Sequence, residues 1–163
     1  MTTALLSRPI VASSAIAAPA DEVLRFLIDL ENHVRLAPGS VEVLSLDRRP
    51  HVGVRALVRL RGPLAIQRMA ATELLQAPAP DSIVGRARIG DSTRASVSWK
   101  IHRRTAGSTV TLCATIDEAG PLDRLLLSLG GRRWLARRFT AALEHLSVQL
   151  APAPASLGLP QSV

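Results

Sequence analysis

Cysteine is almost absent from this sequence of 163 residues, in which Cys113 is the only one. A single cysteine excludes an intrachain disulfide and leaves too few thiolates for a zinc cluster of the usual kind. The four histidines share no metal-ligand spacing, so we predict no metal and no other cofactor. Proteins without disulfides are typical of reducing compartments, and we therefore expect a cytoplasmic location.

Aromatic residues are also scarce, at 2% of the chain, and tyrosine is missing. The rings that remain are those of Phe26, Phe139, Trp99 and Trp134. Proteins that bind single-stranded nucleic acids stack the bases on aromatic side chains. So few rings argue against a nucleic-acid partner.

Lysine occurs once, at Lys100, so nearly all of the positive charge comes from arginine. The net charge is +7 and the isoelectric point is about 11.4. Such a charge normally indicates a nucleic acid or an anionic membrane surface as a partner. The arginines are scattered along strand-like segments, and a biased composition would produce the same excess.

Long apolar runs are missing too. No segment approaches the roughly 20 apolar residues of a membrane-spanning helix, and residues 1–7 lack the pattern of a secretory signal. We expect a soluble protein with one domain over residues 8–150. Residues 1–7 are predicted to be flexible, and the Pro- and Ala-rich residues 151–163 to be disordered.

The chain opens with a strand-like segment, Arg8–Ala17, which is followed by helix signals. Pro19 suits the first turn of a helix, and Asp21 and Glu22 place negative charge at the positive end of the helix dipole. A second short helical piece is predicted over Asn32–Leu36, before Pro38 and Gly39.

Six further strand-like segments follow, separated by short turns rich in proline and glycine. Such short connections favour antiparallel neighbours, because parallel strands need long crossovers. Alternation of apolar and polar residues predicts that one face of the sheet is buried and the other is exposed to solvent. In Ala65–Leu75, Arg68 and Met69 interrupt the alternation, so it is open which of its residues face the core. The six segments are Val41–Asp47, Gly53–Arg61, Ala65–Leu75, Ser82–Ile89, Thr93–Arg103 and Ser108–Asp117.

A long amphipathic helix is predicted at the end of this region, from Pro121 to about Leu150. Gly130 and Gly131 lie in its middle, where a kink or break is expected because glycine weakens helices. The helix carries one apolar stripe, interrupted by Arg132, that we expect to cover the apolar face of the sheet. The stripe consists of Leu122, Leu125, Leu129, Ala136, Phe139, Leu143, Leu146 and Leu150.

The predicted fold class is therefore α+β, with an antiparallel sheet wrapped around a long C-terminal helix and an apolar space between them. No catalytic signature is present, and the catalytic residues stay unknown. Asp29, Glu31 and His33 could form an acid-base group after the first helix. The alternative interpretation, which we prefer, is a solvated helix end.

Arg132 could anchor an anionic ligand by charge-assisted hydrogen bonds, or its side chain could extend out to water. Trp99 and Phe139 could form the floor of a ligand pocket or belong to the core. The residues that we predict to contact a ligand are Phe26, Ala56, Val58, Trp99, Leu112, Ala114, Leu129, Arg132 and Phe139.

Leu127 and Trp134 lie opposite the apolar stripe on an ideal helix, close to Arg137 and Arg138. An apolar pair flanked by arginines fits a membrane surface or a protein partner. A kink at the two glycines could instead turn this pair inward.

Four segments resemble the START-like helix-grip superfamily (SRPBCC), including its polyketide cyclase/dehydrase and lipid-transport branch. They are Val11–Val23, Leu30–Gly39, Ala95–Trp99 and Leu122–Leu146, and the resemblance covers Ile10–Leu150. It implies a seven-stranded antiparallel sheet that grips the C-terminal helix, which agrees with one strand plus six. It also implies a cavity for lipids, sterols, quinones, polyketides or hormones.

Three functional hypotheses follow. The first is a carrier that binds one small apolar molecule, such as a lipid, polyketide or quinone, between the sheet and the last helix. The second is a polyketide cyclase or dehydratase, although the inward positions are mostly apolar, unlike the polar pocket residues that the aromatase/cyclase resemblance implies. The third is a module that docks on an anionic membrane surface or a protein partner through the arginine-rich helix.

Overall fold

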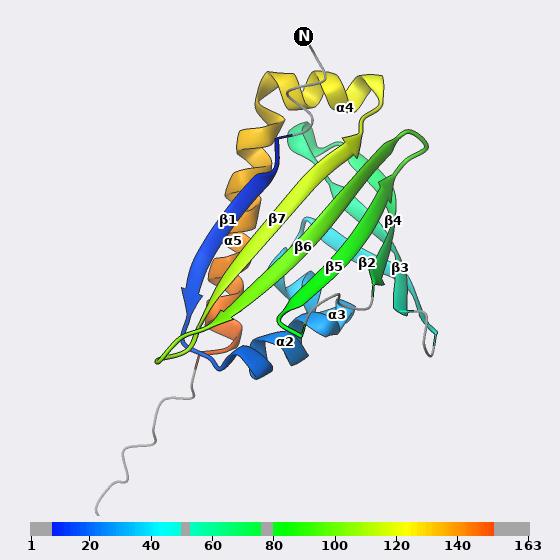
Figure 1. Cartoon of the computed structure of the whole chain (residues 1–163). Coiled ribbons are helices and arrows are strands. Elements are labelled where there is room, and N and C mark those ends of the chain that lie inside the picture. Colours follow the sequence, from blue (N-terminus) through cyan, green and yellow to red (C-terminus); the bar gives the residue numbers. More distant parts are fainter. Residues whose placement is uncertain (1–7, 50–52, 76–79, 152–163) are drawn as a thin grey trace, which may run out of the picture.

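A computed structural model describes residues 8–49, 53–75 and 80–151, so the predictions for residues 1–7 and 152–163 lie outside the described part. Two short helices follow the first strand, and a long helical region ends the chain (Figure 1). The elements are β1 (Ile10–Ile16), α2 (Ala20–Ile28), α3 (Leu30–Leu36), β2 (Val41–Arg49), β3 (Gly53–Arg61), η1 (Pro63–Ala65), β4 (Gln67–Leu75), β5 (Ser82–Ile89), β6 (Thr93–Arg103), β7 (Ser108–Glu118), α4 (Pro121–Leu126), η2 (Leu127–Gly131) and α5 (Arg132–Gln149).

The strands form one seven-stranded antiparallel sheet in the order β1-β7-β6-β5-β4-β3-β2. Strands β2 to β6 each pair with the next strand along the chain, as their short connections require. Strand β1 pairs with β7 and forms one edge of the sheet. The predicted seven-stranded antiparallel sheet is confirmed.

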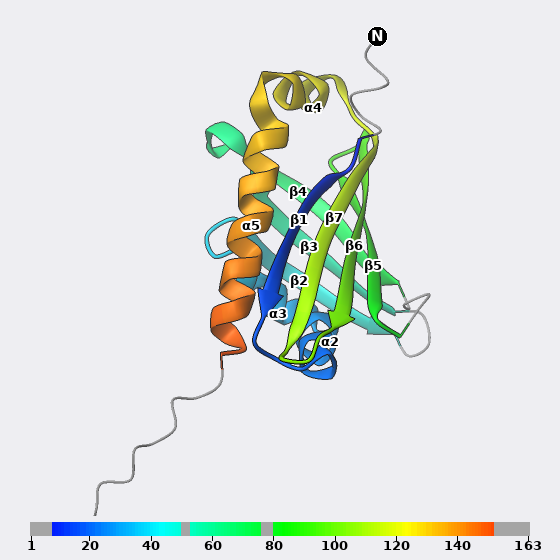
Figure 2. The same ribbon diagram turned by 60° about the vertical axis from the view of Figure 1, so that its left-hand side comes forward.

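Register places most of the buried apolar residues of the strands on one face, which curves around α5 (Figures 1 and 2). It also assigns the ambiguous strand β4: Ala70 pairs with Val58 on the buried face, and Arg68 lies on the same face opposite Leu60. Ala70 is almost completely buried, whereas Met69 on the other face is exposed. We call the apolar side the concave face.

Two helices follow β1, as predicted. Helix α3 begins at Leu30, two residues before the predicted start, because the Asp29 carboxylate accepts a hydrogen bond from the Glu31 backbone N–H at 3.2 Å. Gly39, with φ +70°, lies in the turn between α3 and β2.

The C-terminal helical region is broken at the predicted place. Leu127–Gly131 forms a π-helical turn in which Gly130 has φ +104°. Helix α4 therefore leaves the axis of α5 and lies across the end of the sheet (Figure 2). The predicted stripe is correct for Leu143 and Leu146, which are buried, but wrong at its beginning. Leu122, Leu125 and Leu129 are 48%, 54% and 75% exposed.

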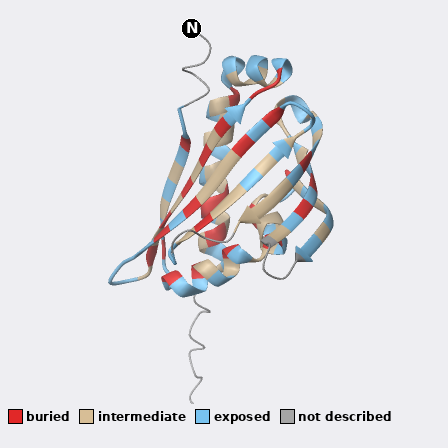
Figure 3. Ribbon diagram, turned by 45° about the vertical axis from the view of Figure 1, so that its right-hand side comes forward, coloured by how far each residue is buried: buried red, intermediate tan, exposed pale blue. Residues whose placement is uncertain are grey.

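Most of the buried apolar residues, whose positions Figure 3 marks in red, belong to one large and two small clusters, and Leu74 packs against both the first and the second. The first and largest joins α2, α3 and the C-terminal half of α5 to strands β1, β5, β6 and β7. The second lies on β3 and β4 and includes Leu30 of α3. The third consists of Ala95, Ile116 and Ala119, against which Leu127 packs.

Candidate functional site

The centre of the concave face keeps accessible apolar surface. Val97 lies on β6 between Ala95, of the third cluster, and Trp99, of the first, yet Val97 itself is only half-buried. Its neighbours across the ladder are Gly85 on β5 and Ala114 on β7. Leu74 on β4 is half-buried as well, although it faces the same side.

Helix α5 lies along β1, with few close approaches of its backbone to β7 (Figure 2). Phe139 of α5 and Phe26 of α2 pack against the first cluster, and both are half-buried. Each therefore keeps part of its aromatic surface accessible.

Five of the predicted ligand-contacting residues point to the concave face and are buried. Trp99 and Leu112 are opposite each other on β6 and β7 and belong to the first cluster. Ala56 and Val58 belong to the second cluster, and Ala114 lies beside Val97. Their contact with a ligand stays a prediction, as it does for Phe26 and Phe139.

Two of the predicted residues lie elsewhere. Leu129 is 75% exposed in the π-helical turn, beyond the end of the sheet. The guanidinium of Arg132 donates hydrogen bonds to the backbone carbonyls of Arg8 and Pro9, the second at 3.4 Å. Arg132 thus joins the start of α5 to the chain entering β1, a contact that its sequence position did not indicate.

His33 lies inside the fold, so its assignment to a solvated helix end was wrong. Its ring meets the Trp99 ring edge-on, with centroids 5.9 Å apart, and its Nε2 lies 2.8 Å from the Leu27 carbonyl oxygen. Burial lowers the pKa of His33, and the Leu27 carbonyl and the charge of Asp29 oppose that effect in part. A signal existed in the sequence, since His33 lies three residues from both Leu30 and Leu36, the buried residues of α3.

The carboxylates of the proposed acid-base group have other roles. Asp29 caps α3 and forms an ion pair with Arg48 at 3.2 Å. Glu31 is exposed and lies 3.5 Å from the same arginine. Neither carboxylate forms a hydrogen bond with the His33 ring among those that the structure describes.

A polar cluster that sequence analysis missed joins α4 to the sheet. The Asp123 carboxylate forms an ion pair with Arg68 of β4 and accepts a hydrogen bond from the Thr93 hydroxyl of β6. The Thr93 oxygen in turn accepts from the Gly120 backbone N–H at 3.1 Å. The cluster lies at the end of the concave face that α4 crosses.

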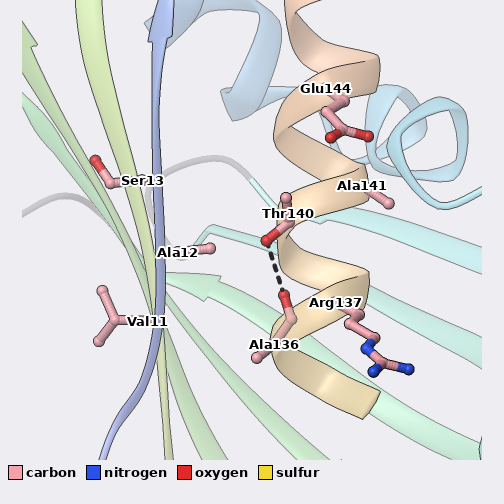
Figure 4. A pocket seen from close by; sticks show the side chains of 8 residues that line it. All are labelled: Val11, Ala12, Ser13, Ala136, Arg137, Thr140, Ala141 and Glu144. Carbon is pink, nitrogen blue, oxygen red and sulfur yellow. Dashed lines mark hydrogen bonds between the residues drawn. The ribbon is translucent and has the colours of Figure 1, made fainter. Parts of the chain in front are cut away.

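A shallow groove of about 350 Å³ runs between β1 and α5 (Figure 4). It is separate from the predicted site, since it includes none of the nine predicted residues. The ends of its helical wall carry opposite charges, from Arg137 and Glu144. Its lining residues are Val11, Ala12, Ser13, Ala136, Arg137, Thr140, Ala141 and Glu144.

Four exposed leucines belong to α4, η2 and η1, and α4 lies across one end of the sheet (Figures 1 and 2). Leu64 in η1 is 87% exposed and has φ +58°, a conformation that is uncommon for a leucine. Leu127, by contrast, packs inward on the third cluster, and Trp134 is half-buried with Arg138 over its ring at 5.3 Å. We call the exposed group the leucine tip: Leu64, Leu122, Leu125 and Leu129.

The architecture defines the class. A seven-stranded antiparallel sheet with two short helices after β1 and a long C-terminal helix packed on it is the helix-grip fold, which a START superfamily protein of known structure shares. Residues 8–150 match the family described as polyketide cyclase/dehydrase and lipid transport. The chain belongs to that family, as its sequence resemblance predicted.

Solved structures agree with this fold. TTHA0849 from Thermus thermophilus has a TM-score of 0.71 at 19% identity, over 88% of this chain and 97% of that chain. The Zhui aromatase/cyclase from Streptomyces sp. R1128 has a TM-score of 0.69 at 16% identity, over 88% and 93%. A START superfamily protein from Mycobacterium smegmatis has a TM-score of 0.65 at 11% identity, over 87% and 96%. Identities this low show similarity of fold alone.

A search of curated proteins finds no significant match to this chain. Within the described residues, none of the helices is both long and apolar enough to cross a membrane.

Proposed function

We propose that this protein binds one small apolar molecule, such as a lipid, polyketide or quinone, between the concave face and α5. The observation that carries the proposal is the incomplete burial of apolar residues on the concave face. Val97 packs against the first cluster and follows Ala95 of the third on the same face, yet it is only half-buried, and so is Leu74, which packs against the first and second clusters. An apolar molecule at Val97 would cover the surface that these residues leave accessible.

The free energy for such binding would come mainly from burial of apolar surface, at about 25 cal/mol per Å² removed from water. Leu74, Phe26 and Phe139 suit this purpose, because they are apolar, half-buried and packed against the same cluster as Val97. Family membership supports the same class of ligand. Catalysis of a cyclase or dehydratase type stays a hypothesis.

The test is a substitution that fills the proposed space. Val97→Trp adds an indole to the centre of the concave face and should abolish binding of the neutral fluorescent probe N-phenyl-1-naphthylamine. Val11→Trp is the matched control, since Val11 is 51% exposed on the edge strand β1 and should leave probe binding unchanged. The proposal is wrong if circular dichroism shows that Val97→Trp is folded and the variant still binds the probe with the affinity of the unaltered protein.

We also propose that the leucine tip docks on anionic bilayers, which is a revised form of the membrane hypothesis. Leu122, Leu125 and Leu129 are exposed along one helical stretch, α4 and η2, and Leu64 of η1 is exposed as well. The neighbouring Arg124 and Arg133 are exposed, and Asp123 beside them is already paired with Arg68. The net charge of +7 adds a general attraction to anionic lipids.

Vesicle flotation tests this second proposal. The protein should float with vesicles that contain phosphatidylglycerol, and the double substitution Leu125→Gln with Leu129→Gln should prevent it. Val148→Gln is the control, because Val148 is 71% exposed near the other end of α5. Equal flotation of the double variant and the control would contradict docking through the tip.

A further inference from the structure

The tautomer of His33 follows from its one hydrogen bond. The Leu27 carbonyl oxygen, 2.8 Å from Nε2, can only accept, so Nε2 carries the proton. In the neutral ring, Nδ1 then holds a lone pair and acts as an acceptor. The ring is neutral at pH 7, because burial lowers its pKa below the ordinary value of 6.5.

Nδ1 of His33 has no hydrogen-bond partner among the described residues. It is not sealed inside the protein either, because the one fully enclosed side-chain nitrogen or oxygen without a partner in the described part is Ser40 Oγ. The indole N–H of Trp99 is in the same position, with neither a partner nor complete enclosure. An acceptor and a donor, on rings 5.9 Å apart, therefore both border open space.

The two rings meet at the inner side of α3. The His33 ring contacts Trp99, which is 6% exposed and belongs to the concave face. The His33 side chain is nevertheless only half-buried, and so is Val97, two residues from Trp99 on the same face.

We propose that His33 Nδ1 accepts a hydrogen bond from a hydroxyl group of the apolar ligand, with Trp99 Nε1 donating to the same hydroxyl oxygen. This inference rests on the proposed ligand-binding function and narrows the ligand to a neutral molecule with an alcohol, phenol or enol at one end. A carboxylate is disfavoured here, because its lone pairs would face that of Nδ1. The assignment replaces Arg132, whose guanidinium binds the backbone before β1, as the polar anchor.

The test compares two probes that differ in one donor: 2-naphthol and its methyl ether, 2-methoxynaphthalene. The unaltered protein should bind 2-naphthol about two- to tenfold more tightly by calorimetry, as expected for one hydrogen bond. His33→Phe keeps an aromatic ring but removes the acceptor, and it should make the two affinities equal by weakening 2-naphthol alone. His33→Gln restores an acceptor and should recover part of the difference.

A second readout is the ¹⁵N resonance of His33 Nδ1, which should shift on addition of 2-naphthol and not of the ether. Equal affinities of the unaltered protein for both probes, or an equal loss for both in His33→Phe, would overturn the assignment. Those results differ from failure of the proposed function itself, in which neither probe shows binding that Val97→Trp blocks. His33→Gln keeps the test decisive if His33→Phe does not fold.

Discussion

Asp123 at the start of α4 forms an ion pair with Arg68 on β4, across 55 residues of sequence. Their side chains are only 16% and 21% exposed, and the same carboxylate accepts from Thr93, which is 3% exposed. Charged groups that are this far removed from water need their partners. The pair therefore fixes α4 across the end of the concave face.

Replacing Asp123 should show how strongly this contact holds α4. Asp123→Ala leaves the Arg68 charge and the Thr93 hydroxyl without the carboxylate, so we expect the free energy of unfolding to fall by about 1–3 kcal/mol. Urea denaturation of the variant and the unaltered protein measures this difference in the free energy of unfolding. Glu118→Gln is the control, because the Arg94–Glu118 pair is more than half exposed and should change stability by less than about 1 kcal/mol. Similar losses in both variants would contradict a special role for Asp123.

Gly107, between β6 and β7, should not tolerate a side chain. A Cβ atom there would lie 2.2 Å from the Ile16 carbonyl oxygen, and its φ of +92° disfavours other residues. Gly107→Ala should therefore lower the melting temperature more than Gly39→Ala. At Gly39 φ is +70° but no atom lies within 4 Å, so that substitution costs only the backbone strain of about 1–2 kcal/mol. Equal effects would show that Ile16 can move aside.

Stability should depend on the protonation of His33. Its pKa is lowered in the folded protein, so between the folded value and the ordinary 6.5 the unfolded chain binds more protons. The contribution of neutral His33 to the free energy of unfolding is then fully present above pH 6.5 and is lost as the pH falls from 6.5 through the lower pKa of the folded protein. Denaturation between pH 7.5 and 5 should show stability falling toward acid, with a smaller slope in His33→Gln. His102→Gln, at an exposed position, should keep the original slope.

Local patterns in the sequence predicted most of the fold. The bounds of β3, β5 and β6 agree with those expected, because alternating residues end at turn-forming residues on both sides. The α4 direction could not be predicted, since it depends on the φ of Gly130. If the helical periodicity is continued through Gly130, Leu129 falls on the buried stripe. In the structure, however, Leu129 is exposed.

The candidate site was less predictable than the fold. Trp99 was correctly placed on the inward face, because alternation fixes the direction of a side chain in a strand. His33 was misplaced because neighbouring charges, Asp29 and Glu31, suggested a solvated end, while the spacing to Leu30 and Leu36 indicated burial. The Arg68–Asp123 pair had no local signal, because it depends on a tertiary contact.

Two leucines of the predicted stripe should now differ sharply in their contribution to stability. Leu143 is 1% exposed in the first cluster, and Leu143→Ala should reduce the free energy of unfolding by about 2–5 kcal/mol. Leu129 is 75% exposed, so Leu129→Ala should reduce the free energy of unfolding by less than about 1 kcal/mol. Chemical denaturation of both variants measures the difference, and comparable losses would mean that the helix continues through Gly130.

Arg132 should act on the edge of the sheet and not on the ligand. Its guanidinium donates to the carbonyls of Arg8 and Pro9, just before β1, in a contact exposed to solvent. Arg132→Ala should therefore speed amide hydrogen exchange in β1 and lower stability by about 1 kcal/mol, because exposed charged hydrogen bonds contribute little. Arg133→Ala, which alters the exposed neighbour, should do neither. Probe affinity should stay the same in both variants, and a selective loss in Arg132→Ala would return this arginine to the binding site.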